Sequence, residues 1–154
     1  MTRISSEATI RRSADEVFDY VTTPANWPQW HPSSIRVTGD AGHSQDVGER
    51  CTEEFVVAGQ HGVCEWVVLR RDAPSSWVIE ARPEAGGRAT ITYALTPDGG
   101  GGTRFTRTLE YEMPNALLAV LDALVIRRRI ERESAQAVAN LRAVLEAAPA
   151  SAAG

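Results

Sequence analysis

The feature that most constrains the fold is a long helical segment near the end of the chain. Residues 115–146 contain neither glycine nor proline and are rich in alanine, leucine, arginine and glutamate. This composition predicts one long helix, with a break near residues 126–129. Apolar or small residues recur along it at helical spacing and mark the face that packs inward: Ile130, Ser134, Ala137, Val138, Leu141, Val144 and Leu145.

The chain before this helix is organised as short strands separated by turn residues. Residues 3–11 alternate between apolar and polar side chains, which indicates a strand with one buried face. Further strands are expected at 35–38, 48–58, 63–71, 77–82, 88–95 and 103–112, with turns at 73–76 and in the glycine run 99–102. Their regular spacing predicts an antiparallel sheet. We expect a single domain over residues 1–147 and a disordered tail at 148–154.

Two short helices are predicted between the first two strands. Ser13 and Glu16 form a capping box, and Pro24 ends the helix that they start. A second helical turn is expected over Trp27–Trp30. His31, which precedes a proline, is expected to be exposed. Two indole rings this close together are costly to leave in water, so they either cover a core or line a hollow.

The order of these elements resembles the helix-grip fold of the START and birch-pollen-allergen superfamily (SRPBCC), especially its bacterial polyketide cyclase/dehydrase-like branch. The motifs that carry the resemblance are Ser-Ala-Asp-Glu-Val-Phe-Asp-Tyr at 13–20, Trp-Pro-Gln-Trp at 27–30, Gly-Glu-Arg at 48–50, Ala-Pro at 73–74, Thr-Tyr-Ala-Leu-Thr-Pro at 92–97, Gly-Thr-Arg-Phe at 102–105 and Asn-Leu-Arg at 140–142. The resemblance implies an α+β fold in which a seven-stranded curved antiparallel sheet wraps the C-terminal helix. It also implies a cavity between the two that takes polyketides, sterols, lipids or aromatic metabolites.

Strand alternation predicts which side chains face the interior. In the later strands the larger apolar residues define the inner face, namely Trp77, Ile79, Ala81, Ile91, Tyr93, Leu95, Phe105, Leu109 and Tyr111, with Arg107 among them. The hairpin at 48–71 is ambiguous, because both of its faces are equally apolar. The resemblance favours the face with Thr52, Glu54, Val56, Ala58, Val63, Glu65, Val67 and Leu69 inward, over the face with Cys51, Glu53, Phe55, Val57, Cys64, Trp66, Val68 and Arg70.

Arg107 is the most informative single residue for function. A buried guanidinium must be paired or it costs several kcal/mol, and Glu54 and Glu65 are its expected partners. It either makes a structural ion pair or orients a carbonyl-bearing ligand. The predicted ligand-binding residues are Trp27, Trp30, Glu54, Glu65, Trp77, Tyr93, Phe105, Arg107, Tyr111, Leu117 and Leu121. The candidates for a catalytic role are Arg107, Glu65 and Tyr93.

Three functions are compatible with these residues. The first is binding of a small hydrophobic or aromatic molecule, such as a polyketide, lipid or sterol. The second is a cofactor-independent aromatase/cyclase or dehydratase that acts on a poly-β-ketone. The third is a stress-response or interaction module. The apolar segment 116–126 could then cover the cavity, form a homodimer seam or touch a membrane surface.

Composition and missing motifs exclude several other classes. The net charge of −4 argues against nucleic acid as a partner, and no apolar run is long enough for stable membrane insertion. Three scattered histidines and two cysteines predict no metal site, and no nucleotide or dinucleotide motif suggests a cofactor. If Gln60 and His61 form the hairpin turn, Cys51 and Cys64 lie about 20 Å apart and stay reduced. We therefore expect a cytoplasmic protein, of bacterial origin by its composition.

Overall fold

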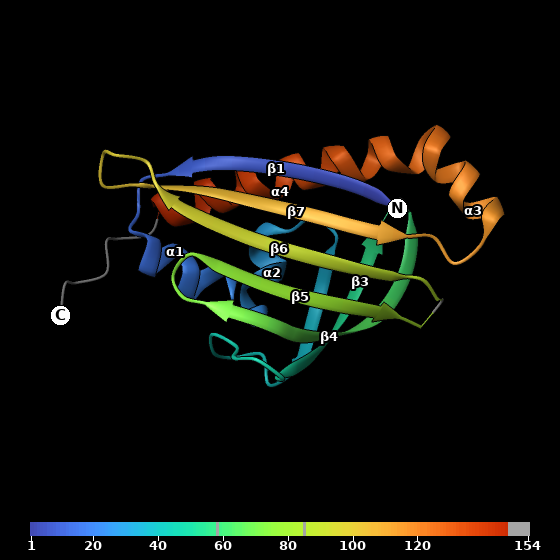
Figure 1. The fold of residues 1–154 in the computed structure, drawn as a ribbon, viewed down its shortest axis with the longest axis horizontal. Coiled ribbons are helices and arrows are strands. Elements are labelled where there is room, and N and C mark those ends of the chain that lie inside the picture. Colours follow the sequence, from blue (N-terminus) through green and yellow to red (C-terminus); the bar gives the residue numbers. More distant parts are fainter. Residues whose placement is uncertain (58, 85, 148–154) are drawn as a thin grey trace.

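A computed structural model describes residues 1–57, 59–84 and 86–147 of this chain. Its strands and helices follow one another in a simple order (Figure 1). The strands are β1 (Thr2–Ile10), β2 (Ser34–Gly39), β3 (Arg50–Val57), β4 (Gln60–Asp72), β5 (Ser76–Pro83), β6 (Arg88–Pro97) and β7 (Thr103–Glu112). The helical elements are α1 (Ala14–Val21), η1 (Pro24–Asn26), α2 (Trp27–Trp30), α3 (Ala116–Leu121), the π-helical turn η2 (Asp122–Ile126) and α4 (Arg127–Ala147).

The seven strands form one curved antiparallel sheet in the order β1-β7-β6-β5-β4-β3-β2. Strand β1 returns to pair with β7, with Ile4 opposite Leu109 and Ile10 opposite Thr103. Helix α4 runs along one face of this sheet, and α1 and α2 lie on the same face (Figure 1). This arrangement is the predicted α+β helix-grip fold. The predicted tail at 148–154 lies outside the described residues.

Local sequence signals place the short helices as predicted. Ser13 caps α1 by accepting a hydrogen bond from the backbone N–H of Glu16. Helix α2 is a single turn that carries both tryptophans, and Trp27 Nε1 donates to the carbonyl oxygen of Val21. Asn140 Nδ2 of α4 donates to the carbonyl oxygen of Trp30 at 3.1 Å. That bond ties α2 to the long helix.

The C-terminal helix is interrupted earlier than the sequence suggested. The break is η2, one turn of π-helix before residue 127, and it separates α3 from α4. Helix α4 buries the predicted stripe, including Ile130, Ser134 and Leu141. Helix α3 buries no residue completely and protrudes past the end of β7 (Figure 1). The two parts of this helical segment therefore play different structural roles.

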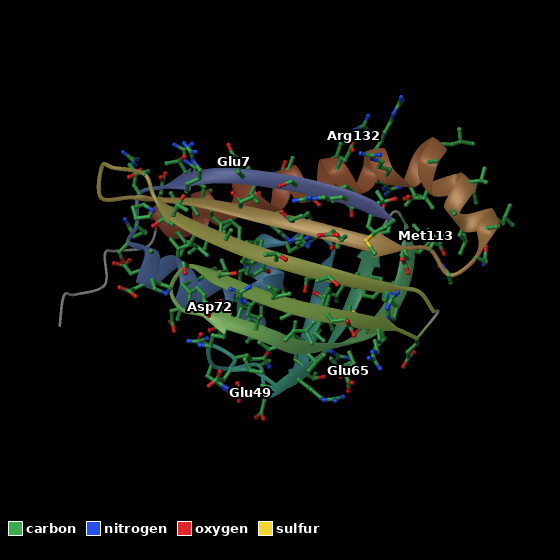
Figure 2. The ribbon with its side chains drawn as sticks, in the orientation of Figure 1. Glu7, Glu49, Glu65, Asp72, Met113 and Arg132 are labelled. Carbon is green, nitrogen blue, oxygen red and sulfur yellow. The ribbon has the colours of Figure 1, made fainter. Side chains whose placement is uncertain are left out.

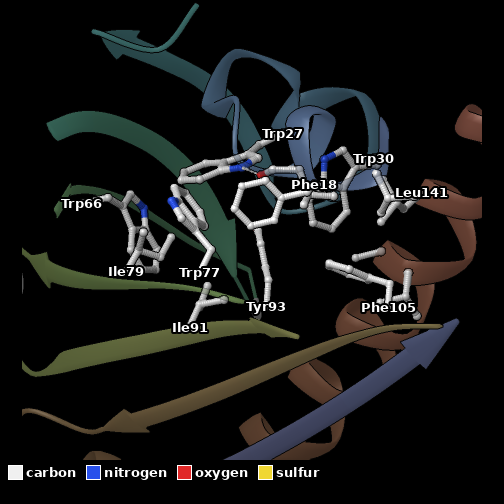
Figure 3. Close-up of a cluster of buried hydrophobic side chains, with 14 of the residues drawn as sticks. Phe18, Trp27, Trp30, Trp66, Trp77, Ile79, Ile91, Tyr93, Phe105 and Leu141 are labelled. Atoms are coloured by element: carbon white, nitrogen blue, oxygen red, sulfur yellow. Dashed lines mark hydrogen bonds between the residues drawn. The ribbon is translucent and has the colours of Figure 1, made fainter. Parts of the chain in front are cut away.

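The main apolar core lies where α1, α2 and α4 face the middle of the sheet (Figure 3). Trp77 and Tyr93 stack with ring centroids 5.4 Å apart, and Trp30 meets Phe105 edge to face at 6.3 Å. Trp77, Phe105 and Leu141 have no exposed surface. Aromatic rings thus fill this end of the interior.

Candidate functional site

A cavity of about 610 Å³ occupies the other end of the interior. It lies between the sheet and the segment from α3 to the first turns of α4, and this volume is in the range of small-molecule sites. Most of its wall is apolar and comes from Phe55, Trp66, Ile79, Ile91, Leu109, Ile126 and Ile130.

The cavity reaches the surface beside α3. Leu118 and Leu121 of α3 line one side, and exposed residues of the two hairpin ends, Gln60, His61 and Arg88, line the other. A guest could therefore enter between α3 and the tips of the β3–β4 and β5–β6 hairpins.

Asp122 fastens the π-helical turn to the sheet. Its side chain is buried, and its carboxylate accepts hydrogen bonds from the hydroxyls of Tyr111 and Thr2. Burial raises the pKa of Tyr111, and the bond to Asp122 adds to the shift because it holds the phenolic proton. π-helical turns often occur at functional sites. This turn sets the position of α3 over the cavity.

Arg107 is a buried charged residue of the cavity wall, and only 5% of its surface is exposed. Its Nη1 donates to Ser134 Oγ at 3.3 Å, and Tyr93 lies directly opposite on β6. Its Nε finds no acceptor, and among the described residues no carboxylate lies within 4.0 Å of the guanidinium. The predicted partners are wrong: Glu54 pairs with Arg36 and Glu65 pairs with Arg50.

Glu53 supplies the carboxylate that we expected from Glu54 or Glu65. It lines the cavity, and its Oε1 accepts a hydrogen bond from Trp66 Nε1 at 3.1 Å. Burial raises the pKa of Glu53, while the bond from Trp66 and the charge of Arg107 oppose the rise. The cavity therefore holds a carboxyl group and a guanidinium.

His31 is a second polar residue of the cavity wall and is half-buried rather than exposed as expected. Its Nδ1 accepts the backbone N–H of Ser33 at 3.2 Å, so a neutral ring carries its proton on Nε2. That Nε2 is buried and has no partner among the described residues. Burial and, to a lesser degree, the charge of Arg107 lower the pKa of His31 well below its usual range. The ring is thus a neutral hydrogen-bond donor at pH 7.

The choice of inner face for the β3–β4 hairpin is a second correction. Cys51, Cys64, Trp66 and Val68 are buried, whereas Glu65 and Leu69 are exposed; Ala58 lies outside the described residues. Leu69 lies on the outer face with Glu65, as alternation along β4 requires once Trp66 and Val68 face inward. Figure 2 shows Glu65 on the outside of the sheet.

The separation of the cysteines is also corrected. Val57 pairs with Gln60, so the turn comes earlier than predicted and Cys51 lies opposite Trp66. Cys64, two residues from Trp66, is therefore close to Cys51 on the same face rather than 20 Å away. Both thiols are free and buried, and burial raises the pKa of Cys51 to about 12.

The structure brings together only part of the predicted ligand-binding set. Those that line the cavity are Trp27, Trp30, Tyr93, Arg107, Tyr111 and Leu121. Trp77 and Phe105 are buried in the packed core instead, and Leu117 is 72% exposed on α3. Glu54 and Glu65 are on the outer face. Alternation in β3 would have identified Glu53 if the face with Cys51 and Phe55 had been taken as the inner one. No sequence signal placed His31 in the interior.

Two further features bear on the site. The described residues include no cluster of three His, Cys, Asp or Glu side chains able to hold a metal ion. Within the same ranges, no helix is both long and apolar enough to cross a bilayer.

Comparisons with known proteins agree with this architecture. A family model described as "Polyketide cyclase / dehydrase and lipid transport" matches residues 1–146. "Penitrem biosynthesis cluster 1 protein I" of Penicillium ochrochloron is 32% identical over 113 residues, which are 67% of this chain and 71% of that protein.

Solved structures share the fold at low identity. TTHA0849 from Thermus thermophilus superposes with a TM-score of 0.74 at 15% identity, over 94% of this chain and 97% of that one. DynU16, a protein of the dynemicin biosynthetic locus, superposes with a TM-score of 0.67 at 14% identity, over 94% of this chain and 47% of that one.

Proposed function

Because the chain belongs to the polyketide cyclase/dehydrase and lipid transport family, we propose that it binds a small hydrophobic or aromatic molecule in the cavity under α3. The observation that carries this proposal is the cavity itself, a largely apolar hollow of about 610 Å³ with a few polar groups in its wall. Two similar proteins named after biosynthetic loci, those of penitrem and dynemicin, support a metabolite as the guest.

The direct test is to identify and then measure a ligand. Protein purified without denaturation is extracted with organic solvent, and the extract is analysed by mass spectrometry. Binding of a panel of polyketides, flavonoids, fatty acids and sterols is then measured by calorimetry. We expect one class to bind with a 1:1 stoichiometry.

A variant that fills the cavity locates the site. Leu109→Phe adds volume to the cavity wall and should weaken binding at least tenfold while the protein stays folded. Ala94→Phe, an exposed position on neighbouring β6, is the matched control and should bind like the wild type. Equal binding by all three proteins would place the ligand elsewhere and contradict the proposal.

A second candidate function is catalysis as a polyketide cyclase or dehydratase, and Glu53 is the observation that favours it. In this reaction the Glu53 carboxylate would take a proton from the carbon beside a ketone. The electron pair would move to the carbonyl oxygen, and Arg107 would stabilise the resulting enolate. Tyr93 remains a candidate through its position opposite Arg107, whereas Glu53 replaces Glu65.

This candidate is tested without knowledge of the natural substrate. The methyl protons of 2-acetylnaphthalene should exchange with deuterated water faster in the presence of the protein than in buffer, as followed by NMR. Glu53→Gln should abolish the acceleration, and Glu65→Gln should retain it. No acceleration by the wild type would favour binding alone.

We also propose that two copies of the chain form a homodimer through the exposed apolar residues of α3 and η2. Leu117, Val120, Leu124 and Val125 are exposed there. Sedimentation over a range of concentrations tests whether two copies cover this surface.

A further inference from the structure

The polar groups of the cavity wall narrow the class of ligand. We propose that the guest carries a carbonyl or carboxylate oxygen that accepts hydrogen bonds from Arg107 and His31, an assignment that rests on the proposed ligand-binding function. The guest is then an aromatic or aliphatic molecule with an oxygen acceptor at one end, rather than a pure hydrocarbon.

Arg107 has more hydrogen-bond donors than the described part of the chain has acceptors for it. A guanidinium offers five N–H donors, yet this one donates to the hydroxyl of Ser134 and has Tyr93 as its direct cross-strand neighbour. Glu53 lies in the same wall and its carboxyl group interacts with the charge of Arg107, but the described residues place no carboxylate within 4.0 Å of the guanidinium, and its Nε has no acceptor. An oxygen of the guest would provide the missing acceptor.

His31 is oriented so that its Nε2–H is free to donate. The bond from the Ser33 amide to Nδ1 leaves the Nε2–H as the free donor of a neutral ring. His31 and Arg107 both belong to the cavity wall, and the charge of Arg107 contributes to the lowered pKa of His31. Arg107 Nε and His31 Nε2 are two donors of the same wall without acceptors in the described part of the protein. They therefore favour a guest that carries an acceptor oxygen.

The rest of the cavity wall is largely apolar. Much of the remaining wall comes from Phe55, Ile79, Ile91, Leu109, Ile126 and Ile130, which offer no hydrogen bonds. Five further polar residues also belong to the wall, and the first three lie at the entrance: Gln60, His61, Arg88, Glu112 and Glu133. His31, Glu53, Arg107 and Ser134 form the polar part of the wall away from the entrance, and apolar side chains make up most of the rest. A guest with one oxygenated end and an apolar body matches this division.

An isosteric ligand series tests the proposal on the wild-type protein. The probes are 2-isopropenylnaphthalene, 2-acetylnaphthalene and 2-naphthoate, which place a methylene, a ketone oxygen or a carboxylate on the same ring. Because hydrogen bonds to a charged group are strong, we expect the ketone to bind about tenfold or more tightly than the alkene in calorimetry. Tighter binding of naphthoate than of the ketone would also support the proposal and would identify the oxygen as anionic.

A variant assigns the preference to Arg107. Arg107→Met should bring the affinities for ketone and alkene within about twofold of each other, while Arg104→Met, an exposed arginine of the same strand, should keep the wild-type ratio. If Arg107→Met fails to fold, the proposal still stands or falls on the wild-type series and on His31. With ¹⁵N-labelled histidine, ketone binding should shift the Nε2–H signal of His31.

The outcomes separate this proposal from the binding function. Equal affinity of the wild type for all three probes would overturn the assignment of an oxygen acceptor while leaving the cavity as a binding site. An oxygen preference that survives Arg107→Met with no change at His31 would overturn it as well. Failure of all three probes to bind would count against the ligand-binding function itself.

Discussion

The two ends of the interior are built from the same sheet and the same helical segment, yet one is solid and the other is hollow. At the solid end, α1 and α2 insert Phe18, Trp27 and Trp30 between the sheet and α4 (Figure 3). At the hollow end, the covering element is α3, whose Leu117 and Val120 point to solvent. The difference teaches that the interior stays hollow where the covering helix supplies few inward side chains: Leu118 and Leu121 line the cavity, but Leu117 and Val120 are exposed.

The largest expected effect comes from making the same substitution at both ends. Leu141→Ala removes a side chain with no exposed surface and should lower the free energy of unfolding by about 2–5 kcal/mol. Leu109→Ala, in the wall of the existing cavity, should cost less, because its side chain is only half-buried. Denaturant titration of both variants measures the difference. Equal losses would contradict the contrast between the two ends.

The next largest effect is expected where Asp122 links the π-helical turn to the sheet. Tyr111→Phe removes one of the two hydroxyls that hold the buried Asp122 carboxylate and should lower the free energy of unfolding by about 1–2 kcal/mol. Tyr20→Phe is the control, because its hydroxyl binds Gln29 at the exposed surface, and it should change stability by less than about 0.5 kcal/mol. A cost for Tyr20→Phe equal to that of Tyr111→Phe would argue against a special role for the Asp122 contact.

A smaller effect should appear as a pH dependence. The pKa of Glu53 is raised in the folded protein, so the native state holds this proton more tightly than the unfolded chain does. Protonated Glu53 makes its full contribution to the free energy of unfolding below the ordinary glutamate pKa. This contribution is lost as the pH rises through the pKa of Glu53 in the folded state. The stability of Glu53→Gln relative to the wild type should therefore increase as the pH rises above the ordinary glutamate pKa.

Glu65→Gln provides the matched comparison for this pH effect. Glu65 pairs with Arg50 on the outer face, where exposed ion pairs contribute little. Thermal unfolding at several pH values should show no comparable trend for this variant. A trend as large as that of Glu53→Gln would argue that the two carboxylates have similar surroundings.

The smallest effect is expected on the exposed surface that α3 and η2 share. Leu124→Ser replaces an exposed side chain and should change the free energy of unfolding by less than about 0.5 kcal/mol. If two copies associate through this surface, the same substitution should weaken dimerisation in sedimentation experiments. A loss of several kcal/mol would mean that this segment packs inward in solution, contrary to the structure.

The sequence predicted the parts of the fold that depend on local pattern. Alternation placed Trp77, Ile79 and Phe105 inside, and the capping pair of Ser13 and Glu16 started α1 where expected. These signals suffice because in each case one face is clearly more apolar than the other, or the interaction lies within one turn.

The candidate site was less predictable, because it depends on contacts that are distant in sequence. Alternation could not choose between adjacent residues such as Glu53 and Glu54, since both faces of the hairpin are apolar. The deciding contact is between Trp66 and Trp27, whose ring centroids lie 6.0 Å apart although the residues belong to different elements. The position of His31 depends in the same way on where α2 docks, and its Nδ1 contact with Ser33 is visible only in the structure.

The π-helical turn also has a consequence for how the length of this chain can vary. Such a turn accommodates one additional residue within a continuous helix, and each residue advances a helix by about 100°. Deleting a single residue from Asp122–Ile126 would therefore swing Leu117 and its neighbours by more than a quarter revolution relative to α4. In this region, the insertion or deletion of one residue therefore determines which side chains of α3 face the cavity and how wide its opening is.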